Sequence, residues 1–357
     1  MENNTDLLTE VTTTVNAFLS REYYTEQIVN QKLVAPIVYL AILLLIGLPG
    51  NISILIIYRN YNKNVYRKII WIIAIVDLLF CLIGVPFNLG RLFNYYNFKS
   101  LRACQIVAGL LDSGIMTSTH LLVLLTVHRY RQVCYPLRRQ ITTQNVTYFI
   151  AACFAIGFAS GIPQIAVLQP LGETEIGNRV TGYTCTVAWK DSPPGWKNYN
   201  IFLSSLFLFY TILLFVLYAF IGRTLLRLKR RRRTDNYREN ATNNRSSGLS
   251  MKITQIAFTV SIVFAISYVP LFLNEVAIKD VDETKLSWTK FAFLKIVQRS
   301  YLINHVANAF IYYRFDNHFR SRLNSCFITS AQCMKNDNNN EQTNNVTEPP
   351  RSVNLGI

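Results

Sequence analysis

Charged residues are scarce in this chain: Asp, Glu, Lys and Arg make up only 16% of its 357 residues, too few to cover a soluble protein of this length. Histidine is scarcer still. The four histidines include no pair spaced i and i+4, the spacing of two metal ligands on one helix face: His120, His128, His305 and His318. Residues 1–32 also lack the apolar run of a secretory signal peptide. The sequence therefore favours neither a soluble domain nor a metal-dependent enzyme.

Hydrophobic residues, by contrast, make up 51% of the chain. They gather into runs of about 20 residues, the length that crosses the hydrocarbon core of a bilayer. Backbone groups in lipid must be satisfied internally, so these runs must be helices. We predict an all-α membrane protein, a seven-transmembrane helix bundle over residues 33–313. The predicted helices cover residues 34–58, 69–93, 103–133, 146–169, 199–228, 252–278 and 290–313.

The net charge of +16 does not indicate nucleic-acid binding, because its distribution follows the membrane. Basic residues concentrate in alternate connections, at Arg59–Lys68, Arg131–Arg139 and Arg223–Arg233, whereas the connection around Glu173 to Asp191 mixes signs. By the positive-inside rule, the N-terminus lies outside and the C-terminus inside. The run Lys229–Arg233 then favours docking to the membrane surface or to a partner.

The two ends of the chain are polar. We expect residues 1–32 to form an extracellular tail, with a glycosylation sequon at Asn3. Residues 314–327 place an apolar side chain at every fourth position, which predicts a short amphipathic helix on the membrane surface: Phe315, Phe319, Leu323 and Phe327. Cys326, close to the membrane, is a candidate for palmitoylation. Residues 328–357 are predicted to be a disordered cytoplasmic tail.

The triplet His128-Arg129-Tyr130 closes the third apolar segment. Five other polar or structural residues lie in the first, second, sixth and seventh apolar segments, in this order: Asn51, Asp77, Pro270, Asn308 and Tyr312. Over residues 33–326 the chain resembles the rhodopsin-like G-protein-coupled receptors. The resemblance implies a plasma-membrane receptor that passes ligand binding to a heterotrimeric G protein, with no enzymatic activity and no cofactor. It also implies a short eighth helix after the seventh.

Cys104 and Cys185 match a pair of cysteines in that family. Both fall on the predicted outer side, which is the oxidising side where a disulfide persists. We expect them to pair and to tie the third helix to the second outer connection. Two free thiols are the alternative.

Asp77 lies midway along the second helix, and a charged side chain at bilayer depth needs a partner. Ser118, Asn304 and Asn308 occupy the places where the family assembles a sodium site around this aspartate. Asn51 would join the same network. The resemblance therefore implies a sodium ion as an allosteric ligand; a hydrogen-bond cluster without an ion is the alternative.

The switch residues of the family are also matched, with departures. The family has an acid before Arg129 that holds the arginine at rest; here His128 stands there, so that this lock is absent or pH-sensitive. We therefore expect raised basal signalling. In the sixth helix Phe264 and Pro270 are retained, and Tyr268 replaces a tryptophan. Tyr218 and Tyr312 match two tyrosines that support the active arrangement. Ala309 and Tyr210 replace prolines, and Cys153 or Phe154 stands near the usual fourth-helix tryptophan; these departures indicate a divergent member.

The ligand is predicted to be a peptide by analogy with neuropeptide receptors, on the long connection 170–198 and the stretch His128–Leu137. Leu111 and Leu302 stand where amine receptors and opsins carry an aspartate and a lysine, which disfavours those ligands. The candidate ligand contacts are Asn88, Asp112, Glu275 and Gln298. Glu275 suits a basic group of a peptide, and its alternative partner is Arg299.

Other classes fit less well. A transporter would show internal repeats, and a channel would show a filter-like segment; we find neither. A poorly coupling decoy, a constitutively active receptor and a receptor for a non-peptide ligand stay open. His120 and His305 could also face one another inside the bundle, although simple packing is the alternative.

Overall fold

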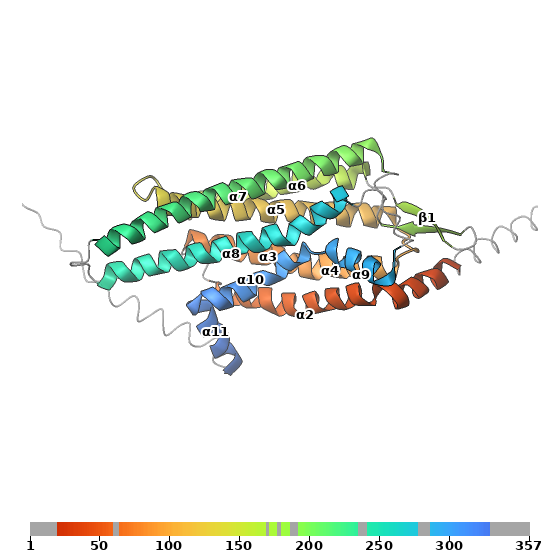
Figure 1. Ribbon diagram of the computed structural model, residues 1–357, viewed down its shortest axis with the longest axis horizontal. Coiled ribbons are helices and arrows are strands. Elements are labelled where there is room, and N and C mark those ends of the chain that lie inside the picture. The colour runs from red at the N-terminus through yellow and green to blue at the C-terminus, as the bar shows by residue number, and fades with distance from the viewer. Residues whose placement is uncertain are drawn as a thin grey trace, which may run out of the picture.

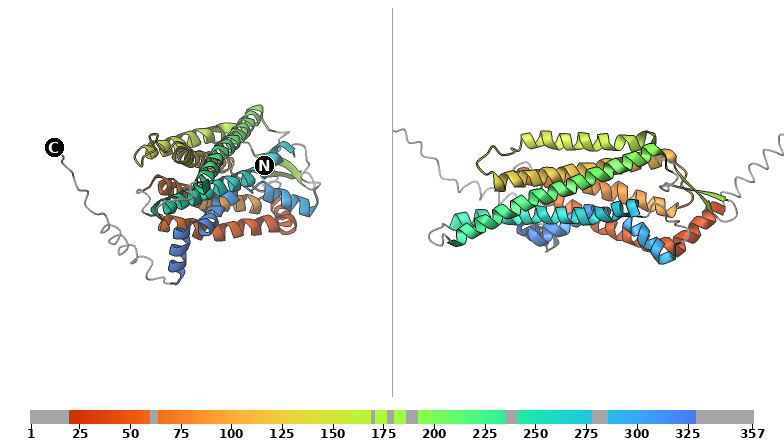
Figure 2. Two further views of the ribbon diagram at one scale, coloured as in Figure 1. Left: turned by 60° about the vertical axis from the view of Figure 1, so that its left-hand side comes forward. Right: turned by 45° about the horizontal axis from the view of Figure 1, so that its top comes forward.

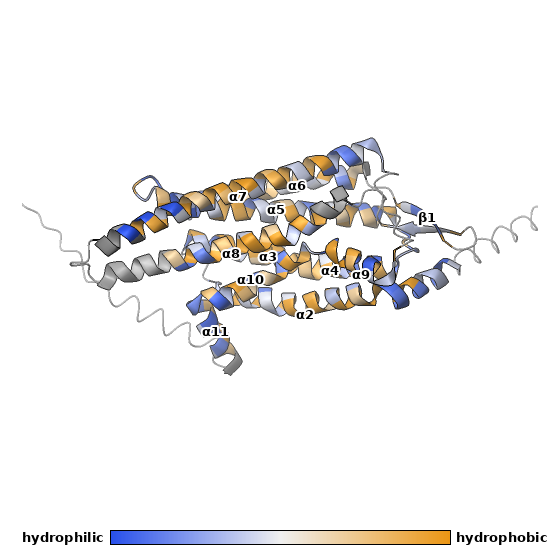
Figure 3. Cartoon of the chain, viewed as in Figure 1, coloured by the Kyte–Doolittle hydropathy of each residue, from blue (hydrophilic) through white to orange (hydrophobic). Residues whose placement is uncertain are grey.

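The computed structural model of the chain describes residues 20–59, 64–168, 171–176, 180–185, 192–234, 241–277 and 286–328. Long helices run side by side along one axis and form a bundle (Figure 1, Figure 2). Their middle parts are apolar and their ends polar (Figure 3), as expected of helices that cross a bilayer. Within the described ranges, six helices are long and apolar enough to span a membrane.

The elements follow the predicted segments closely. In chain order they are η1 (Val29–Leu33), α2 (Val34–Ile57), α3 (Val65–Leu79), η3 (Phe80–Gly84), α4 (Val85–Phe93), α5 (Leu101–Cys134), α6 (Asn145–Pro163), η4 (Gln164–Leu168), β1 (Gly172–Ile176), β2 (Val180–Thr184), α7 (Pro194–Thr234), α8 (Ala241–Ala277), α9 (Trp288–Val297), α10 (Leu302–Phe315) and α11 (Asn317–Ile328). The span Val65–Phe93 comprises α3, η3 and α4, and η3 is a wider helical turn within it.

The first helix begins earlier than predicted. It runs without a break from Ser20 to Ile57, so residues 20–32 of the expected tail are helical, and their extracellular location stays a prediction. Ile28 and Leu33 are buried against the rest of the bundle, which explains why this polar stretch is ordered. The predicted sequon at Asn3 lies outside the described residues.

The seventh segment is two helices rather than one. Between α9 and α10 the backbone tightens, and the N–H groups of Arg299, Ser300 and Leu302 each donate to the carbonyl three residues earlier. Irregular backbone at membrane depth is tolerated where protein buries it, and Arg299 and Ser300 are buried. The prediction of one helix over 290–313 is therefore corrected, and the seventh crossing is the broken pair α9 and α10.

Helices α5 and α6 pack unusually closely through small residues. Gly157 and Gly161 of α6 lie four residues apart and face Gly109, Ser113 and Thr117 of α5. A Cβ atom on Gly161 would lie 2.1 Å from the Ser113 Oγ and 2.3 Å from the Gly109 carbonyl oxygen. Since lipid removes most of the hydrophobic drive between helices, such close backbone approach is a main source of association.

A short hairpin closes one end of the bundle. Strands β1 and β2 are antiparallel, with Glu173 opposite Tyr183. The predicted Cys104–Cys185 disulfide is confirmed and joins the end of β2 to α5, with 5.7 Å between the Cα atoms. Tyr183 also donates its N–H to the Tyr96 carbonyl at 2.9 Å. The strands were not predicted. We call this end of the molecule the hairpin end.

The opposite end, which we call the α11 end, carries α11 directly after α10, turned away from the bundle (Figure 1). Asp316 starts it, because its carboxylate accepts the N–H groups of His318 and Phe319. The Tyr58 hydroxyl donates to the other oxygen of Asp316 at 2.5 Å, so that α11 is tied to the first helix. The predicted amphipathic helix over residues 314–327 is thus helical in the structure.

The close α5–α6 contact can be tested with two matched glycine substitutions. Gly161→Ala should lower the thermal stability of the purified protein, because an added methyl group must push two backbones apart at a cost of about 1–3 kcal/mol. Gly222→Ala, where a Cβ meets nothing within 4 Å, should leave the stability unchanged or slightly raised. Equal unfolding midpoints for both variants would contradict the close-packing account.

Candidate functional site

The centre of the bundle holds one fully buried carboxylate, Asp77 of α3. Its Oδ1 lies 2.7 Å from the His305 Nδ1, and its Oδ2 accepts from the Asn308 Nδ2 at 2.6 Å. Both partners belong to α10. A buried charge must be paired, so the second and seventh segments are held together at this point.

Asn51 and Phe80 complete the setting of His305. The Asn51 amide donates to the His305 carbonyl oxygen at 2.9 Å, which brings the first helix into the same network. The imidazole stacks on the Phe80 ring with 3.7 Å between centroids and 6° between planes. The predicted link between Asn51 and the Asp77 network is therefore present, but it runs through His305, a residue that was predicted only to face His120 or to pack.

Two further residues, Asn304 and Ser118, were predicted to belong to a sodium site. Asn304 and Ser118 are buried, and within the described part of the chain the Ser118 hydroxyl has no hydrogen-bond partner. Each oxygen of Asp77 already has a nitrogen at hydrogen-bond distance. A sodium ion would need those oxygens as ligands. A sodium ion beside the carboxylate would therefore have to share these oxygens with His305 and Asn308.

The proline segment of α8 touches this centre. The Tyr268 hydroxyl lies 3.3 Å from the His305 Nε2. Its ring packs on Phe264, with 4.8 Å between the ring centroids. Pro270 lies within α8, where proline removes one helix hydrogen bond. The Ser300 hydroxyl, at the break between α9 and α10, donates to the Ser267 carbonyl at 2.6 Å. The irregular parts of the sixth and seventh segments thus support one another.

Arg129 lies near the α11 end and is only 4% exposed. Its guanidinium lies over the Tyr66 ring of α3, 4.4 Å from the centroid, and donates to the Gln132 Oε1 at 2.7 Å. Neither ring nitrogen of the buried His128 has a hydrogen-bond partner among the described residues. Arg129 is therefore held by an aromatic face and an amide, and His128 does not hold it.

The two predicted support tyrosines are both buried. The Tyr218 hydroxyl of α7 lies 3.1 Å from the Thr126 hydroxyl and accepts from the Ser261 hydroxyl at 3.2 Å, which joins α5, α7 and α8. Tyr312 packs edge-on against Tyr58, with 6.0 Å between centroids. Tyr130 is half-buried and packs edge-on against Tyr135.

His120 has a different partner from the one suggested. Its Nε2 lies 2.7 Å from the hydroxyl of Tyr210, the residue at the expected proline position of the fifth helix. The suggested contact between His120 and His305 is therefore wrong, because His305 faces Asp77. The pair joins α5 to α7 at mid-bundle.

No hydrogen bond joins one candidate ligand contact to another among the described residues. Asn88 is buried and donates to the Tyr301 hydroxyl at 3.1 Å. Asp112 of α5 accepts from the Tyr199 hydroxyl at 3.2 Å and has no cationic partner in the described part of the chain. Gln298 is half-buried at the α9–α10 break. The side chain of Glu275 lies outside the described part.

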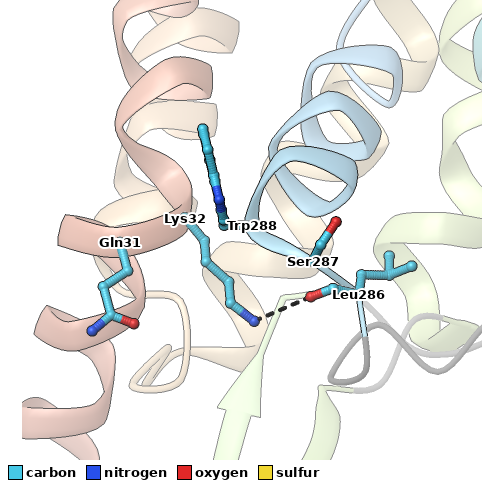
Figure 4. A pocket seen from close by; sticks show the side chains of 5 residues that line it. All are labelled: Gln31, Lys32, Leu286, Ser287 and Trp288. Atoms are coloured by element: carbon cyan, nitrogen blue, oxygen red, sulfur yellow. Dashed lines mark hydrogen bonds between the residues drawn. The ribbon is translucent and has the colours of Figure 1, made fainter.

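A shallow groove at the hairpin end involves none of these four residues. It is lined by Gln31, Lys32, Leu286, Ser287 and Trp288, and the Lys32 ammonium donates to the Leu286 carbonyl oxygen across it (Figure 4). The groove lies between the first helix and the start of α9, and no sequence pattern indicated it.

Cys326, the predicted lipidation site, lies half-buried on α11. Its sulfur is disulfide-bonded in the structure, so that acylation would require the reduced thiol. Lipidation of Cys326 stays a prediction.

Known proteins resemble the chain over most of its length. It is 24% identical to neuromedin-U receptor 2 of Mus musculus, covering 82% of this chain and 74% of that protein. It is 26% identical to the RYamide receptor of Drosophila melanogaster, covering 81% and 62%, and 24% identical to neuropeptide Y receptor type 2 of Cavia porcellus, covering 83% and 76%.

The fold resembles a solved receptor as well. The crystal structure of squid rhodopsin superimposes with a TM-score of 0.68 at 13% identity, over 90% of this chain and 88% of that one. The model of the 7 transmembrane receptor (rhodopsin family) matches residues 50–312, which include Asp77, Arg129 and Tyr312. This match covers well over half of the chain. The chain therefore belongs to the rhodopsin family of seven-transmembrane receptors, which are receptors and not enzymes.

Proposed function

We propose that the chain is a plasma-membrane receptor that binds a peptide at the hairpin end and activates a heterotrimeric G protein at the α11 end. The observation that carries this proposal is a connected series of contacts from Asn88, towards the hairpin end, to Asp77 at the centre of the bundle. Asn88 donates to Tyr301, the Tyr301 ring packs on Tyr268, and Tyr268 reaches Asp77 through His305. A ligand that moves Asn88 or Tyr301 would therefore act on the sixth and seventh segments together.

The ligand class is supported by the relatives. Three of them are named as receptors for neuromedin-U, RYamide and neuropeptide Y. The hairpin, fixed to α5 by the Cys104–Cys185 disulfide, extends the surface that an extracellular peptide would meet. An N-terminus outside the cell agrees with the basic residues at the other end of the helices.

Coupling is assigned to the α11 end. Arg129 is buried there on Tyr66, and the exposed Arg223 and Arg227 project from α7 beyond the core. Because ligand and G protein would each favour the same arrangement of the bundle, each would strengthen binding of the other. Arg129 would have to leave the Tyr66 ring to contact a partner.

The proposal is tested by heterotrimer dissociation in cells that express the full chain, screened against a library of peptides. A peptide should raise dissociation in the wild type, and Arg129→Ala should abolish the response at equal surface expression. An epitope tag at the N-terminus should be accessible on intact cells. A response to non-peptide compounds alone would overturn the ligand class, and silence of a well-expressed receptor would favour a decoy.

Asp112 gives a prediction about the ligand. Asp112→Asn keeps an acceptor for the Tyr199 hydroxyl but removes the charge. If a basic group of the peptide pairs with this carboxylate, potency should fall about 30-fold, as expected for a charge-assisted bond of about 2 kcal/mol. Concentration–response curves measure this. Glu173→Gln, an exposed carboxylate on β1, is the control and should change little; an equal loss in both variants would contradict a specific role.

His128 gives a prediction about basal activity. His128→Asp places an acid beside Arg129, which the wild type lacks, and should lower ligand-independent G-protein dissociation by up to about 30-fold for a pair worth about 2 kcal/mol. His128→Asn, of similar size but uncharged, should lower it less. Unchanged basal signal in the Asp variant would show that Arg129 is not limiting at rest.

A further inference from the structure

Both oxygens of the Asp77 carboxylate have a protein partner. It is fully buried, and one nitrogen lies within 2.7 Å of each oxygen, from His305 and from Asn308. Since His305 Nδ1 faces a carboxylate, it carries the proton in this contact, in either the neutral or the cationic ring. Each oxygen of the carboxylate is therefore met by an N–H donor from within the chain.

The His305 ring is fixed on every side for which the structure gives a contact. It is 1% exposed, one face stacks on Phe80, and its Nε2 lies 3.3 Å from the Tyr268 hydroxyl. Its backbone carbonyl is held by Asn51. The ring cannot turn away from Asp77 without losing the stacking and both hydrogen bonds. It is part of the folded core rather than a mobile side chain.

The arrangement differs from a cation site in the kind of atoms that face Asp77. A hard cation is held by several oxygens, and neutral side-chain oxygens normally join the carboxylate. Here Asn308 presents its amide nitrogen to Asp77, and His305 presents a ring nitrogen. The other two expected residues, Asn304 and Ser118, are buried, and the Ser118 hydroxyl has no hydrogen-bond partner within the described residues.

We propose that the His305 side chain takes the place of a sodium ion at Asp77, so that stability and signalling do not depend on sodium. The histidine supplies a hydrogen-bond donor to the carboxylate from within the chain. It also does what a bare ion cannot, since its second nitrogen meets Tyr268 and so attaches α8 to Asp77. The inference concerns an ion rather than the peptide or the G protein, and it stands apart from the proposed function.

The test uses purified full-length receptor in lipid nanodiscs, without ligand. Thermal unfolding is followed while sodium chloride replaces potassium chloride at constant ionic strength. The wild type should unfold at the same temperature in both salts. His305→Ser frees the Asp77 oxygen and adds a hydroxyl, and it should gain a saturable, sodium-specific rise of about 2 °C or more.

Two controls assign the effect. Asp77→Asn combined with His305→Ser should lose the sodium response, because the charged ligand is gone. His305→Ala, which removes the ring nitrogen from Asp77 without adding another donor, serves if the serine variant does not fold, and it should also gain sodium sensitivity. Sodium-specific stabilisation of the wild type would overturn the proposal. So would folded His305→Ser and His305→Ala variants that both ignore sodium, since no ion would then be replaced.

Discussion

The pairing of Asp77 inside an apolar bundle constrains most of the structure around it. A carboxylate at that depth has no water to solvate it, so the chain must bring donors to it from other helices. His305 and Asn308 do so from α10, and Tyr268 and Asn51 then attach the sixth and first helices to His305. Four of the crossing segments thus meet at one ionisable group. Any motion of one of them must exchange hydrogen bonds that have no solvent replacement.

The break between α9 and α10 is part of the same constraint. A continuous helix would use the backbone N–H groups of residues 299–302 for ordinary helix bonds, and the tighter turn shifts the register of everything that follows. The Ser300 hydroxyl meets the Ser267 carbonyl at the proline segment of α8 because of that turn. The break is therefore hydrogen-bonded to α8 within one turn of Pro270, so that two irregular backbone segments meet.

Much of this architecture was predictable from the sequence. The apolar runs predicted where the crossing helices lie, although α8 begins at Ala241 rather than at residue 252 and the first helix at Ser20 rather than at residue 34. The outer-side location of Cys104 and Cys185 indicated their disulfide. The start of the first helix at Ser20 was not predictable, because it depends on burial of Ile28 and Leu33 by segments far away in the sequence. The hairpin had a signal that was overlooked, since Gly177-Asn178 between two threonine-containing stretches is typical of a hairpin turn.

The sequence predicted which residues belong to the site better than it predicted the contacts between them. Asp77, Asn51 and Asn308 form one network, as the resemblance implied, but the role of His305 depended on which neighbour its ring would meet. Helical position alone left His120 and Asp77 both conceivable as partners. Likewise Asn88 and Asp112 both lie towards the hairpin end, yet they face different neighbours, Tyr301 and Tyr199.

The length of α7 has a mechanical consequence. Its 41 residues form one helix with no interior proline, about 60 Å long, whereas the hydrocarbon core of a bilayer is about 30 Å thick. Together with α8 it extends well past the other helices (Figure 1). If α7 tilts about mid-bundle, where the Tyr210 hydroxyl meets His120, that contact is the pivot and the protruding end of α7 is a lever arm. A rotation too small to disturb the packing at that pivot becomes a large displacement at the tips, in proportion to their distance from it.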